Sequence, residues 1–425
     1  MRKDGKSERL REAAGPGQLW LQLPGLVREA LYETVITAGL ACVDEALEAE
    51  RSRLCGARYQ HLPGRQALRA GHVASSLVLG GRRVAVNRPR ARSVDGHELS
   101  LPSWREWSTR DPLTERALEQ MVLGVSTRRY ARSLEPLPPT ASVRGISKSA
   151  VSERFVYGTE RKLVELMSRE LGQLSFTTLF IDGVHFGEHV VLAAVGVDDH
   201  GEKHVLGLRE GATENSSACK ALLADLIERG LDTEHSLLIV IDGAKALHKA
   251  VVEVFGARAL IQRCREHKKR NVTEALPERQ RASVRTAMNQ AYATRDAKRA
   301  RRLLDNLARR LEDQHPGAAA SLREGLDETL TVIRLGLPES LERVLSSTNL
   351  IENLFSRVRE IGRRVRRWQS GTMVLRWSAA GVLEAERSFR KIVGYRAMPI
   401  LVAALRAHDA KIDRASTVDE AEKAA

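Results

Sequence analysis

Two aspartates stand at positions where their carboxylates could share metal ions. Asp182 and Asp242 each end a short apolar segment, "FTTLFID" and "SLLIVID", and each is followed by glycine. Ligands of open α/β sheets bind outside the carboxyl ends of the strands. Two carboxylates held close together repel and raise each other's pKa unless a cation lies between them. Because Asp-Gly alone is more often a plain turn, only the pairing of the two indicates chemistry.

A third carboxylate, Glu352, lies in the segment Ser346–Trp368, "SSTNLIENLFSRVREIGRRVRRW". Apolar residues recur there at helical spacing, and the polar residues 346–349 are candidate N-caps. The spacing predicts a helix with Glu352 in its first turns, next to the apolar face. This pattern suits a metal ligand at the edge of a surface that binds a polyanion. It equally fits an amphipathic helix with a solvated basic face. The basic residues of this segment are Arg357, Arg359, Arg363, Arg364, Arg366 and Arg367.

Together the three carboxylates would suit magnesium, which prefers hard oxygen ligands in near-octahedral geometry. Two ions about 3.5–4 Å apart can activate a water or a 3′-hydroxyl and stabilise the leaving oxygen of a phosphodiester. The composition favours such a substrate, because 68 lysines and arginines against 54 acidic residues give a net charge of +14. A charge of this size indicates a nucleic acid or another polyanion as the partner.

Other classes of protein fit the sequence less well. Aromatic residues make up only 4% of the chain, and no long basic amphipathic segment carries a Trp/Phe face for a membrane surface. The N-terminus has no apolar core of a secretory signal, and the longest apolar runs are too short to span a bilayer. The scattered cysteines show neither zinc-ribbon nor CxxC spacing, which predicts a reduced, cytoplasmic protein.

The hydrophobic period changes to that of β-strands at Phe176. In a ribonuclease H-like arrangement of the predicted order, the first and fourth strands lie side by side, which would make Asp182 and Asp242 neighbours. Residues 272–340 are rich in Ala, Arg, Leu and Glu and predict an all-helical insertion. The predicted elements before it are strands at 176–182, 188–198 and 202–211, a helix at 214–230, a strand at 236–242, a helix with Leu247 and Val251, and a strand at 258–263.

The N-terminal part predicts a helix over Leu26–Gly56 and then a β-hairpin. The hairpin is "ASSLVLGGRRVAVNRPRAR", in which apolar residues alternate on both sides of a Gly-Gly pair. Its second strand runs into Arg88, Arg90 and Arg92. These arginines could lie on a phosphate backbone, or they could mark a charged edge strand that resists aggregation.

Residues 112–168 return to a helical pattern. Within them, "GISKSAVSERF" resembles a turn leading into a DNA-recognition helix, in which Gly145 allows the turn and Ser147 caps the helix. An ordinary helical hairpin would look alike. The donors that could reach phosphates and base edges are Lys148, Ser149, Ser152 and Arg154.

Several segments resemble the successive motifs of Mutator-type bacterial insertion-sequence transposases, a branch of the DDE transposases. They are "FIDGVHF", "VIDGAKAL", "IQRCREHKKRNV" and "SSTNLIENLFSRVR", and their order also matches. The likeness covers roughly residues 170–400 and extends more weakly to the N-terminal part. It implies a ribonuclease H-like catalytic core broken by a helical insertion, and DNA cleavage and strand transfer with Mg²⁺ or Mn²⁺, two ions in all. It also implies a bacterial, nucleoid-associated location.

Carried over residue by residue, the resemblance makes Asp182 the first, Asp242 the second and Glu352 the third acid. It places His267 in a C-x-x-H signature with Cys264 near the catalytic centre. We favour His267 as a group that orients the scissile phosphate or an acid; a capping histidine over a buried cysteine is the alternative. The phosphate contacts expected along these motifs are Lys268, Lys269, Arg270, Arg357, Arg363 and Arg364.

The expected fold class is an α/β ribonuclease H-like core interrupted by an all-helical insertion, preceded by helical and small β DNA-binding segments. The expected regions are an N-terminal helix and hairpin region (1–110), a helix-turn-helix-like region (111–170), the first part of the core (171–271), the insertion (272–340), the C-terminal helices of the core (341–412) and a flexible tail (413–425).

The leading hypothesis is a DDE transposase that cleaves and transfers DNA at the terminal inverted repeats of an insertion sequence. Its partners would be double-stranded DNA of the ends and of the target and, from the family, further copies of the chain in a dimer or larger assembly, with no membrane. Another ribonuclease H-like nuclease, or a domesticated DNA-binding protein without catalysis, would share many of these features. A helical scaffold with incidental charge would show no salt-dependent DNA binding.

Overall fold

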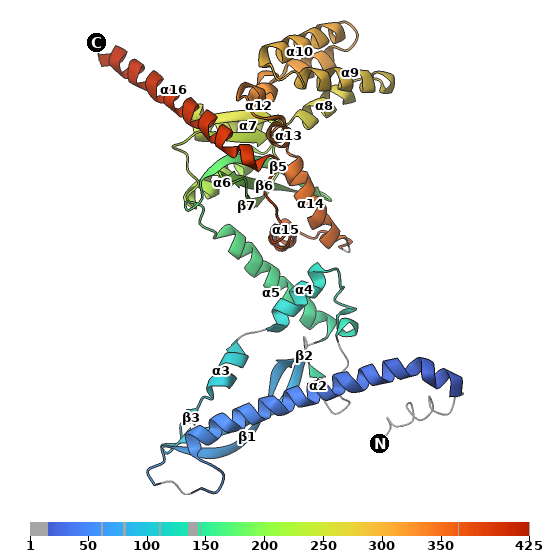
Figure 1. The fold of residues 1–425 in the computed structure, drawn as a ribbon, viewed down its shortest axis with the longest axis vertical. Helices are drawn as coiled ribbons and strands as arrows, with labels where there is room; N and C mark the ends of the chain where they lie inside the picture. The colour runs from blue at the N-terminus through green and yellow to red at the C-terminus, as the bar shows by residue number, and fades with distance from the viewer. Residues whose placement is uncertain are drawn as a thin grey trace. The chain divides into compact units, whose positions relative to one another are not determined.

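The computed structural model describes residues 16–60, 63–79, 82–109, 112–134, 143–144, 146–363 and 365–424. The chain divides into two compact units, Met1–Gly158 and Thr159–Ala425. Figure 1 traces the elements of both. Among the helices in these ranges, none has both the length and the apolar character needed to cross a lipid bilayer.

The first unit begins with a long helix and a β-hairpin, as predicted. The helix starts earlier than expected and ends just before Gly56, whose φ of 81° breaks the helical path. The hairpin strands pair antiparallel with Leu77 opposite Val84, and the Gly-Gly turn lies outside the described residues. The elements are α2 (Pro16–Cys55), β1 (Ala67–Leu79), β2 (Arg82–Ser93), β3 (Glu98–Leu99), α3 (Pro102–Thr109) and β4 (Val143–Arg144).

The basic strand β2 pairs with β1 along one side, and on its other side it pairs with the two-residue strands β3 and β4 only at 91–92 and 83–84. Arg92 is thus in a paired part of the strand, whereas Arg88 and Arg90 lie in a stretch whose second side has no strand partner among the described residues, so the edge-strand alternative stays open for these two. Arg90 forms a 2.6 Å ion pair with Glu98, and Arg88 and Arg92 each lie 3.5 Å from the same carboxylate. Hydrogen bonding to Arg90 is the main reason why the pKa of Glu98 falls to about 2. Three guanidinium groups share one carboxylate, so the cluster stays positive.

A small helical cluster ends the first unit. Ala117, Tyr130, Leu134 and Val151 form its buried core. The Ser147 hydroxyl accepts a hydrogen bond from the backbone N–H of Ala150 at 3.3 Å, which confirms the predicted cap, whereas Gly145 lies outside the described residues. The elements are α4 (Pro112–Val122), the 3₁₀ turn η1 (Tyr130–Ser133) and α5 (Lys148–Met167), which continues into the second unit.

The second unit is built on a mixed five-stranded sheet with the order β7-β6-β5-β8-β9. β5, β6 and β7 are antiparallel to one another in turn, while β8 runs parallel to β5 and β9 parallel to β8. The predicted strand order and the adjacency of the first and fourth strands are confirmed. The strands are β5 (Phe176–Phe186), β6 (His189–Asp198), β7 (Lys203–Glu210), β8 (Leu237–Ile241) and β9 (Ala259–Arg263).

Helices cover both faces of this sheet. Because successive strand residues point to opposite faces, Leu179 and Ile181 pack against α6 and α7, whereas Phe180 packs with residues of α14, α15 and α16. The result is a layered α/β unit with two apolar cores. The covering helices are α6 (Ser216–Glu228), α7 (Lys245–Phe255), α14 (Asn349–Gly362), α15 (Gly371–Glu386) and α16 (Met398–Ala424).

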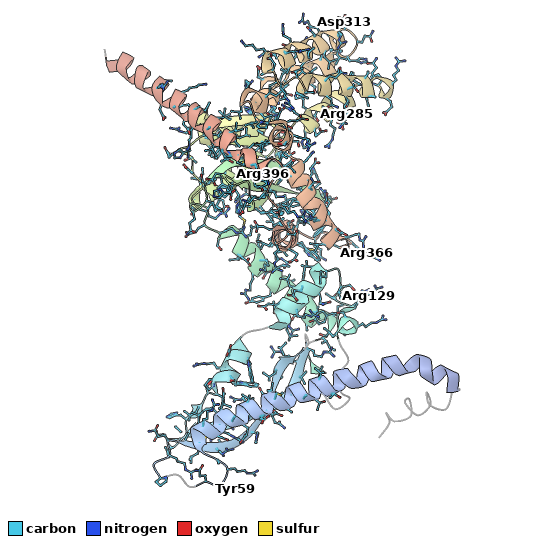
Figure 2. The ribbon with its side chains drawn as sticks, in the orientation of Figure 1. Tyr59, Arg129, Arg285, Asp313, Arg366 and Arg396 are labelled. Atoms are coloured by element: carbon cyan, nitrogen blue, oxygen red, sulfur yellow. The ribbon has the colours of Figure 1, made fainter. Side chains whose placement is uncertain are left out.

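The predicted helical insertion is confirmed and has a buried apolar core of its own. In Figure 1 its helices form a separate group beside the sheet, and charged side chains such as Arg285 and Asp313 stand on its outer surface in Figure 2. Its elements are α8 (Arg265–Glu274), α9 (Glu278–Tyr292), α10 (Ala297–Glu312), α11 (Pro316–Arg323), η3 (Asp327–Leu330), α12 (Thr331–Arg334) and α13 (Glu339–Leu345).

Two helix ends differ from the sequence predictions. The helix of Glu352 ends at Gly362 and does not reach Trp368, whose indole lies over Gly362 and contacts the rings of Phe186 and Trp377. The half-buried indole draws the chain back to the core, which an extended helix would not allow. The expected flexible tail is instead backbone helix through Ala424, in a segment rich in strong helix formers.

The close approach of α14 and α15 gives a test of this packing. A Cβ on Gly381 would lie 3.0–3.3 Å from side-chain carbons of buried Val358. We expect Gly381→Val to lower the free energy of unfolding by about 1–3 kcal/mol through overpacking, seen as a lower melting temperature. Gly317→Ala is the matched control, because a Cβ there meets nothing within 4 Å, and it should leave stability unchanged or raise it by up to about 1 kcal/mol. Equal melting temperatures for wild type and Gly381→Val would contradict this packing.

Candidate active site

Asp182 and Asp242 come from adjacent parallel strands. Ile181 of β5 is in register with Ile241 of β8, so Asp182, the next residue of β5, lies beside Asp242, which directly follows β8. The prediction that Asp182 ends its strand is wrong, because β5 continues to Phe186 along its antiparallel partner β6. Asp182 is only 5% exposed, and its Oδ1 accepts a 2.8 Å hydrogen bond from the backbone N–H of Gly183. Burial raises the pKa of Asp182 to about 6, and the charge of Asp242 adds to the rise.

Asp242 is held by two hydrogen bonds in a half-buried position. Its Oδ2 accepts from the Thr213 hydroxyl at 2.9 Å, and its Oδ1 accepts from the backbone N–H of Ala244 at 3.0 Å. Thr213 follows β7 in the segment "REGATEN", and its contact was not predicted. Neither the composition of this segment nor its spacing indicates which strand end the hydroxyl faces.

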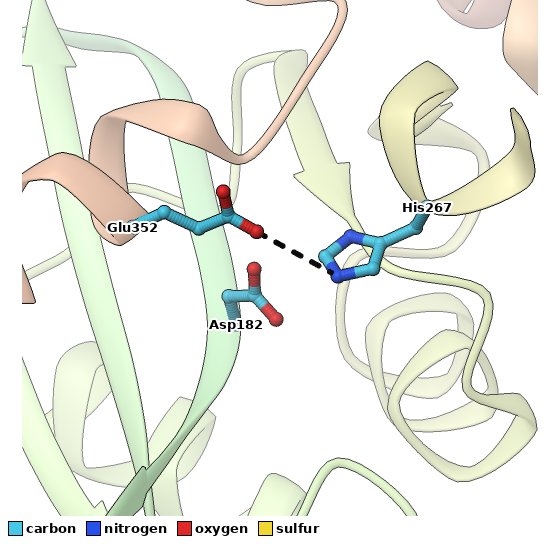
Figure 3. A group of neighbouring side chains, drawn as sticks. All are labelled: Asp182, His267 and Glu352. Atoms are coloured by element: carbon cyan, nitrogen blue, oxygen red, sulfur yellow. Dashed lines mark ion pairs between the residues drawn. The ribbon is translucent and has the colours of Figure 1, made fainter. Parts of the chain in front are cut away.

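Glu352 reaches the site from the first turn of α14. Figure 3 shows its carboxylate facing His267 of α8, with Asp182 beside both. The Glu352 Oε1 atom lies 3.9 Å from His267 Nε2 and 3.9 Å from Arg270 Nη2. Possible ligand atoms of Asp182, His267 and Glu352 all lie within 4.8 Å of one another. Asp242 is outside this group of three, although its charge acts on the pKa values of both Asp182 and His267.

A sulfur-centred set of hydrogen bonds holds His267 and the start of α14. Cys264 Sγ accepts from the backbone N–H of His267 at 3.5 Å and of Thr348 at 3.4 Å. The Thr348 hydroxyl lies 3.5 Å from the same sulfur and 3.4 Å from His267 Nδ1. Thr348 occupies the predicted N-cap position of α14, but its side chain does not cap that helix. Sequence reasoning identified the position and missed its contact with His267.

The charges around His267 favour its protonated form. Hydrogen bonding to the Cys264 side chain, with the negative charges of Cys264, Asp182 and Asp242, raises the pKa of His267 to about 9 against the effect of burial. Burial alone would raise the pKa of Cys264, but interactions with His267 and the backbone N–H groups lower it. His267 is therefore a cation at neutral pH that faces two carboxylates.

Lys268 and Lys269, predicted as phosphate contacts, are instead internal. They are 4% and 7% exposed. Lys268 Nζ donates to the backbone carbonyls of Ser321 and Glu324, and Lys269 Nζ bonds to Glu266 and to Asn289 Oδ1 at 2.9 Å. We therefore withdraw both as DNA contacts. They fix α8 to α9 and to the end of α11 within the insertion, a role that a Lys-Lys-Arg run does not reveal.

The other predicted DNA contacts differ in their exposure. Arg270, whose side chain is 53% exposed, lies at the site next to Glu352. Arg154 is half-buried and donates to the backbone carbonyl of Ala150. Arg366, at the end of the arginine run, projects outward in Figure 2, and Arg364 lies outside the described residues. The remaining predicted contacts are exposed: Lys148, Ser149, Ser152, Arg357 and Arg363.

The residues that meet here could hold a metal ion. Carboxylate oxygens of Asp182 and Glu352 are the hard ligands that Mg²⁺ and Mn²⁺ prefer, and Asp242 stands on the neighbouring strand. A buried carboxylate such as Asp182, whose charge is unfavourable by itself, fits a site that a cation completes. His267 can serve as a ligand only after losing its proton.

Comparison with known proteins gives a consistent result. The model of the transposase family named "Transposase, Mutator family" matches residues 24–390. The transposase for insertion sequence element ISRM5 of Rhizobium meliloti (strain 1021) is 28% identical over 358 residues, which cover 83% of this chain and 88% of the relative. The transposase for IS256 in transposon Tn4001 of Staphylococcus aureus is 26% identical over 369 residues, covering 84% and 90%. The transposase for IS406 of Burkholderia multivorans (strain ATCC 17616 / 249) is 30% identical over 363 residues, covering 80% and 88%.

The raised pKa of Asp182 predicts that this carboxylate destabilises the metal-free protein. Above pH 6 the folded protein must bury the charged carboxylate, whereas the unfolded chain keeps the same charge in water, so the folded state is destabilised. Below the usual pKa of 3.8 both states carry the neutral acid, and this destabilisation is absent. Asp182→Asn should therefore raise the free energy of unfolding by about 2–3 kcal/mol at pH 8, and the gain should disappear as the pH falls through 6 toward 4.

The measurement is thermal denaturation in chelator at pH 8, 6 and 4. Asp313→Asn, a change at an exposed carboxylate of the insertion, is the control and should shift stability by less than about 0.5 kcal/mol. Added Mg²⁺ should raise the melting temperature of the wild type and not of Asp182→Asn. A lower melting temperature for Asp182→Asn at pH 8 would contradict the account of Asp182.

Proposed function

Because this chain belongs to the Mutator family of transposases, we propose that it cuts DNA at the terminal inverted repeats of an insertion sequence and joins the ends to target DNA. Asp182, Asp242 and Glu352 are the acids of this DDE chemistry. The observation that carries the proposal is the meeting of Asp182 and Glu352, far apart in the chain, within 4.8 Å, with Asp242 on the adjoining strand end.

The core is proposed to be ribonuclease H-like. The order β7-β6-β5-β8-β9, with three antiparallel strands followed by two parallel ones, supports this assignment. So does the position of the acids at the point where β8 ends beside β5: Asp242 directly follows β8, and Asp182 follows Ile181, the last residue of β5 that pairs with β8. The predicted division into a DNA-binding N-terminal part, a two-part core and an insertion is retained within this proposal.

The residues have separate roles in the proposed reaction. The three carboxylates would hold two Mg²⁺ or Mn²⁺ ions, and the chemistry that such a pair would supply is activation of a water or 3′-hydroxyl nucleophile and stabilisation of the leaving oxygen of the phosphodiester. Protonated His267 and exposed Arg270 lie on the Glu352 side of the site and orient the scissile phosphate by charge-assisted hydrogen bonds. Thr213 fixes the Asp242 carboxylate, and Thr348 fixes the imidazole of His267.

Binding of the DNA ends is proposed to involve more than the core. The exposed face of Lys148, Ser149 and Ser152 at the start of α5 offers short donors to a DNA groove. The net charge of +14 supplies attraction that depends on salt. Since two ends of one element must be handled together, we propose that a dimer or larger assembly acts on them.

The test is a cleavage and strand-transfer assay on a supercoiled plasmid carrying the element's ends, with Mg²⁺ or Mn²⁺. Asp182→Asn, Asp242→Asn and Glu352→Gln should each lower the rate at least about 100-fold, because the metal-binding charge is lost. DNA affinity should change less than about threefold. Glu360→Gln removes an exposed carboxylate from the same helix as Glu352 and should cut normally.

Two results would refute the proposal in different ways. Wild-type protein that binds ends and never cuts with either metal would be a DNA-binding protein without catalysis. Cutting that survives in Asp182→Asn would mean that another group of residues performs it.

A further inference from the structure

A basic pocket lies beside the candidate active site in the second unit. Its volume is about 720 Å³, it is open to solvent on one side, and it is lined by the start of β7, by α13 and α14, and by the loop after α15. Ser347, Asn349 and Asn353 add polar groups, and none of the described residues that line it is a carboxylate. We call it the basic pocket, and its cationic residues are Lys203, Arg343, Arg357, Arg390 and Lys391.

Most of this charge is not neutralised within the protein. Arg357 donates to the Ser388 hydroxyl at 2.7 Å, which is a neutral partner. Lys391 Nζ lies 3.5 Å from Glu202 Oε1, a carboxylate outside the pocket lining. Among the described residues, Arg343 and Arg390 form no ion pair, and both are exposed. The pocket therefore presents several cations that an anion could bind together.

The cations are close enough to affect one another. Burial lowers the pKa of Lys203, and the positive charge of Arg357 lowers it further. Lys203 Nζ lies 4.8 Å from the ring centroid of Phe389, so the aromatic face compensates part of its charge. A bound phosphate would relieve this repulsion, since like charges disfavour each other's charged forms.

The pocket and the candidate active site share helix α14. Asn353 lines the pocket. The preceding residue, Glu352, lies on a different side of the same helix and faces Asp182 and His267. Ser347 lines the pocket directly before Thr348, which contacts His267. An α-helix with its side chains is about 10–12 Å across. This width corresponds to about three nucleotides at roughly 3.4 Å of rise each.

We propose that the basic pocket holds the phosphates of one DNA strand, two to four nucleotides from the bond that is cut. The cations come from four separate elements, which suits several linked phosphates better than one small anion. The inference rests on the proposed function, because it takes the scissile phosphate to lie at Asp182 and Glu352. The pocket would fix the register of the strand, so that one particular bond reaches the acids.

The first experiment measures binding of the full chain to an end duplex in chelator, over 50–200 mM salt. Arg343→Ala/Arg390→Ala should flatten the slope of log affinity against log salt by about 1.8, the value for two lost phosphate contacts. At the lowest salt its affinity should be at least about tenfold weaker. The control, Arg302→Ala/Arg310→Ala, removes the same charge from exposed positions of α10 and should stay within about twofold of wild type.

A second experiment locates the strand without requiring catalysis. Asn353→Cys, in a Cys42→Ser background that removes an exposed thiol, is tested with end duplexes carrying a thiol tether at successive nucleotides. Disulfide yield should peak two to four nucleotides from the junction of element and flank. Arg302→Cys should give no peak. Melting curves check that every variant is folded.

Each outcome bears on the proposal. A slope equal to that of wild type or of the control, or an even disulfide yield along the duplex, would overturn it. Binding of deoxyadenosine monophosphate at micromolar concentration in the absence of DNA, together with unchanged DNA affinity in the double variant, would make the pocket a free-nucleotide site. That result would also overturn the proposal. Normal cutting by wild type without a disulfide peak would reject the pocket alone, whereas a peak without any cutting would reject the proposed catalysis alone.

Discussion

The sulfur of Cys264 joins the two ends of the helical insertion. It accepts hydrogen bonds from His267 at the beginning of the helical insertion and from Thr348 at its end. Beside it, the backbone N–H of Arg265 donates to the backbone carbonyl of Ser346 at 2.9 Å. The backbone N–H of Cys264 donates to the backbone carbonyl of Ile241 at 2.8 Å. The chain thus leaves the sheet and returns to it at one point. Because Glu352 follows a few residues later, its distance from the aspartates depends on this closure.

Buried polar contacts reinforce the closure from the side of the insertion. Arg265 forms a 2.7 Å ion pair with Glu342, in which both side chains are 9% exposed, and Gln262 of β9 bonds to the backbone of Thr329 and Val332. A buried pair of this kind contributes little net stability but is strongly unfavourable to break. It therefore favours one arrangement of insertion and sheet. The acids, by contrast, meet at the cost of burying Asp182, a tension that a bound cation would relieve.

Local patterns predicted most of the elements, and chain topology predicted part of the site. Alternation and apolar runs identified the strands, and their order was enough to place Asp182 beside Asp242. Contacts between distant segments were not accessible in this way. The Thr213 hydroxyl on Asp242 and the carbonyl partners of Lys268 depend on how loops and insertion pack in three dimensions. Trp368 likewise ends α14 through a ring contact that no local helix signal contains.

The two ends of the insertion are hydrogen-bonded to each other, so a change in its length need not alter the distance between them. Changes within α9 to α11 leave the hydrogen bonds at Cys264 and Ser346 in place, since none of those helices supplies a group to them. The length and the surface of this segment can therefore change while the acids keep their spacing. The same geometry makes the segment a suitable place for inserting a foreign domain, for example one that binds a chosen DNA sequence in the genome.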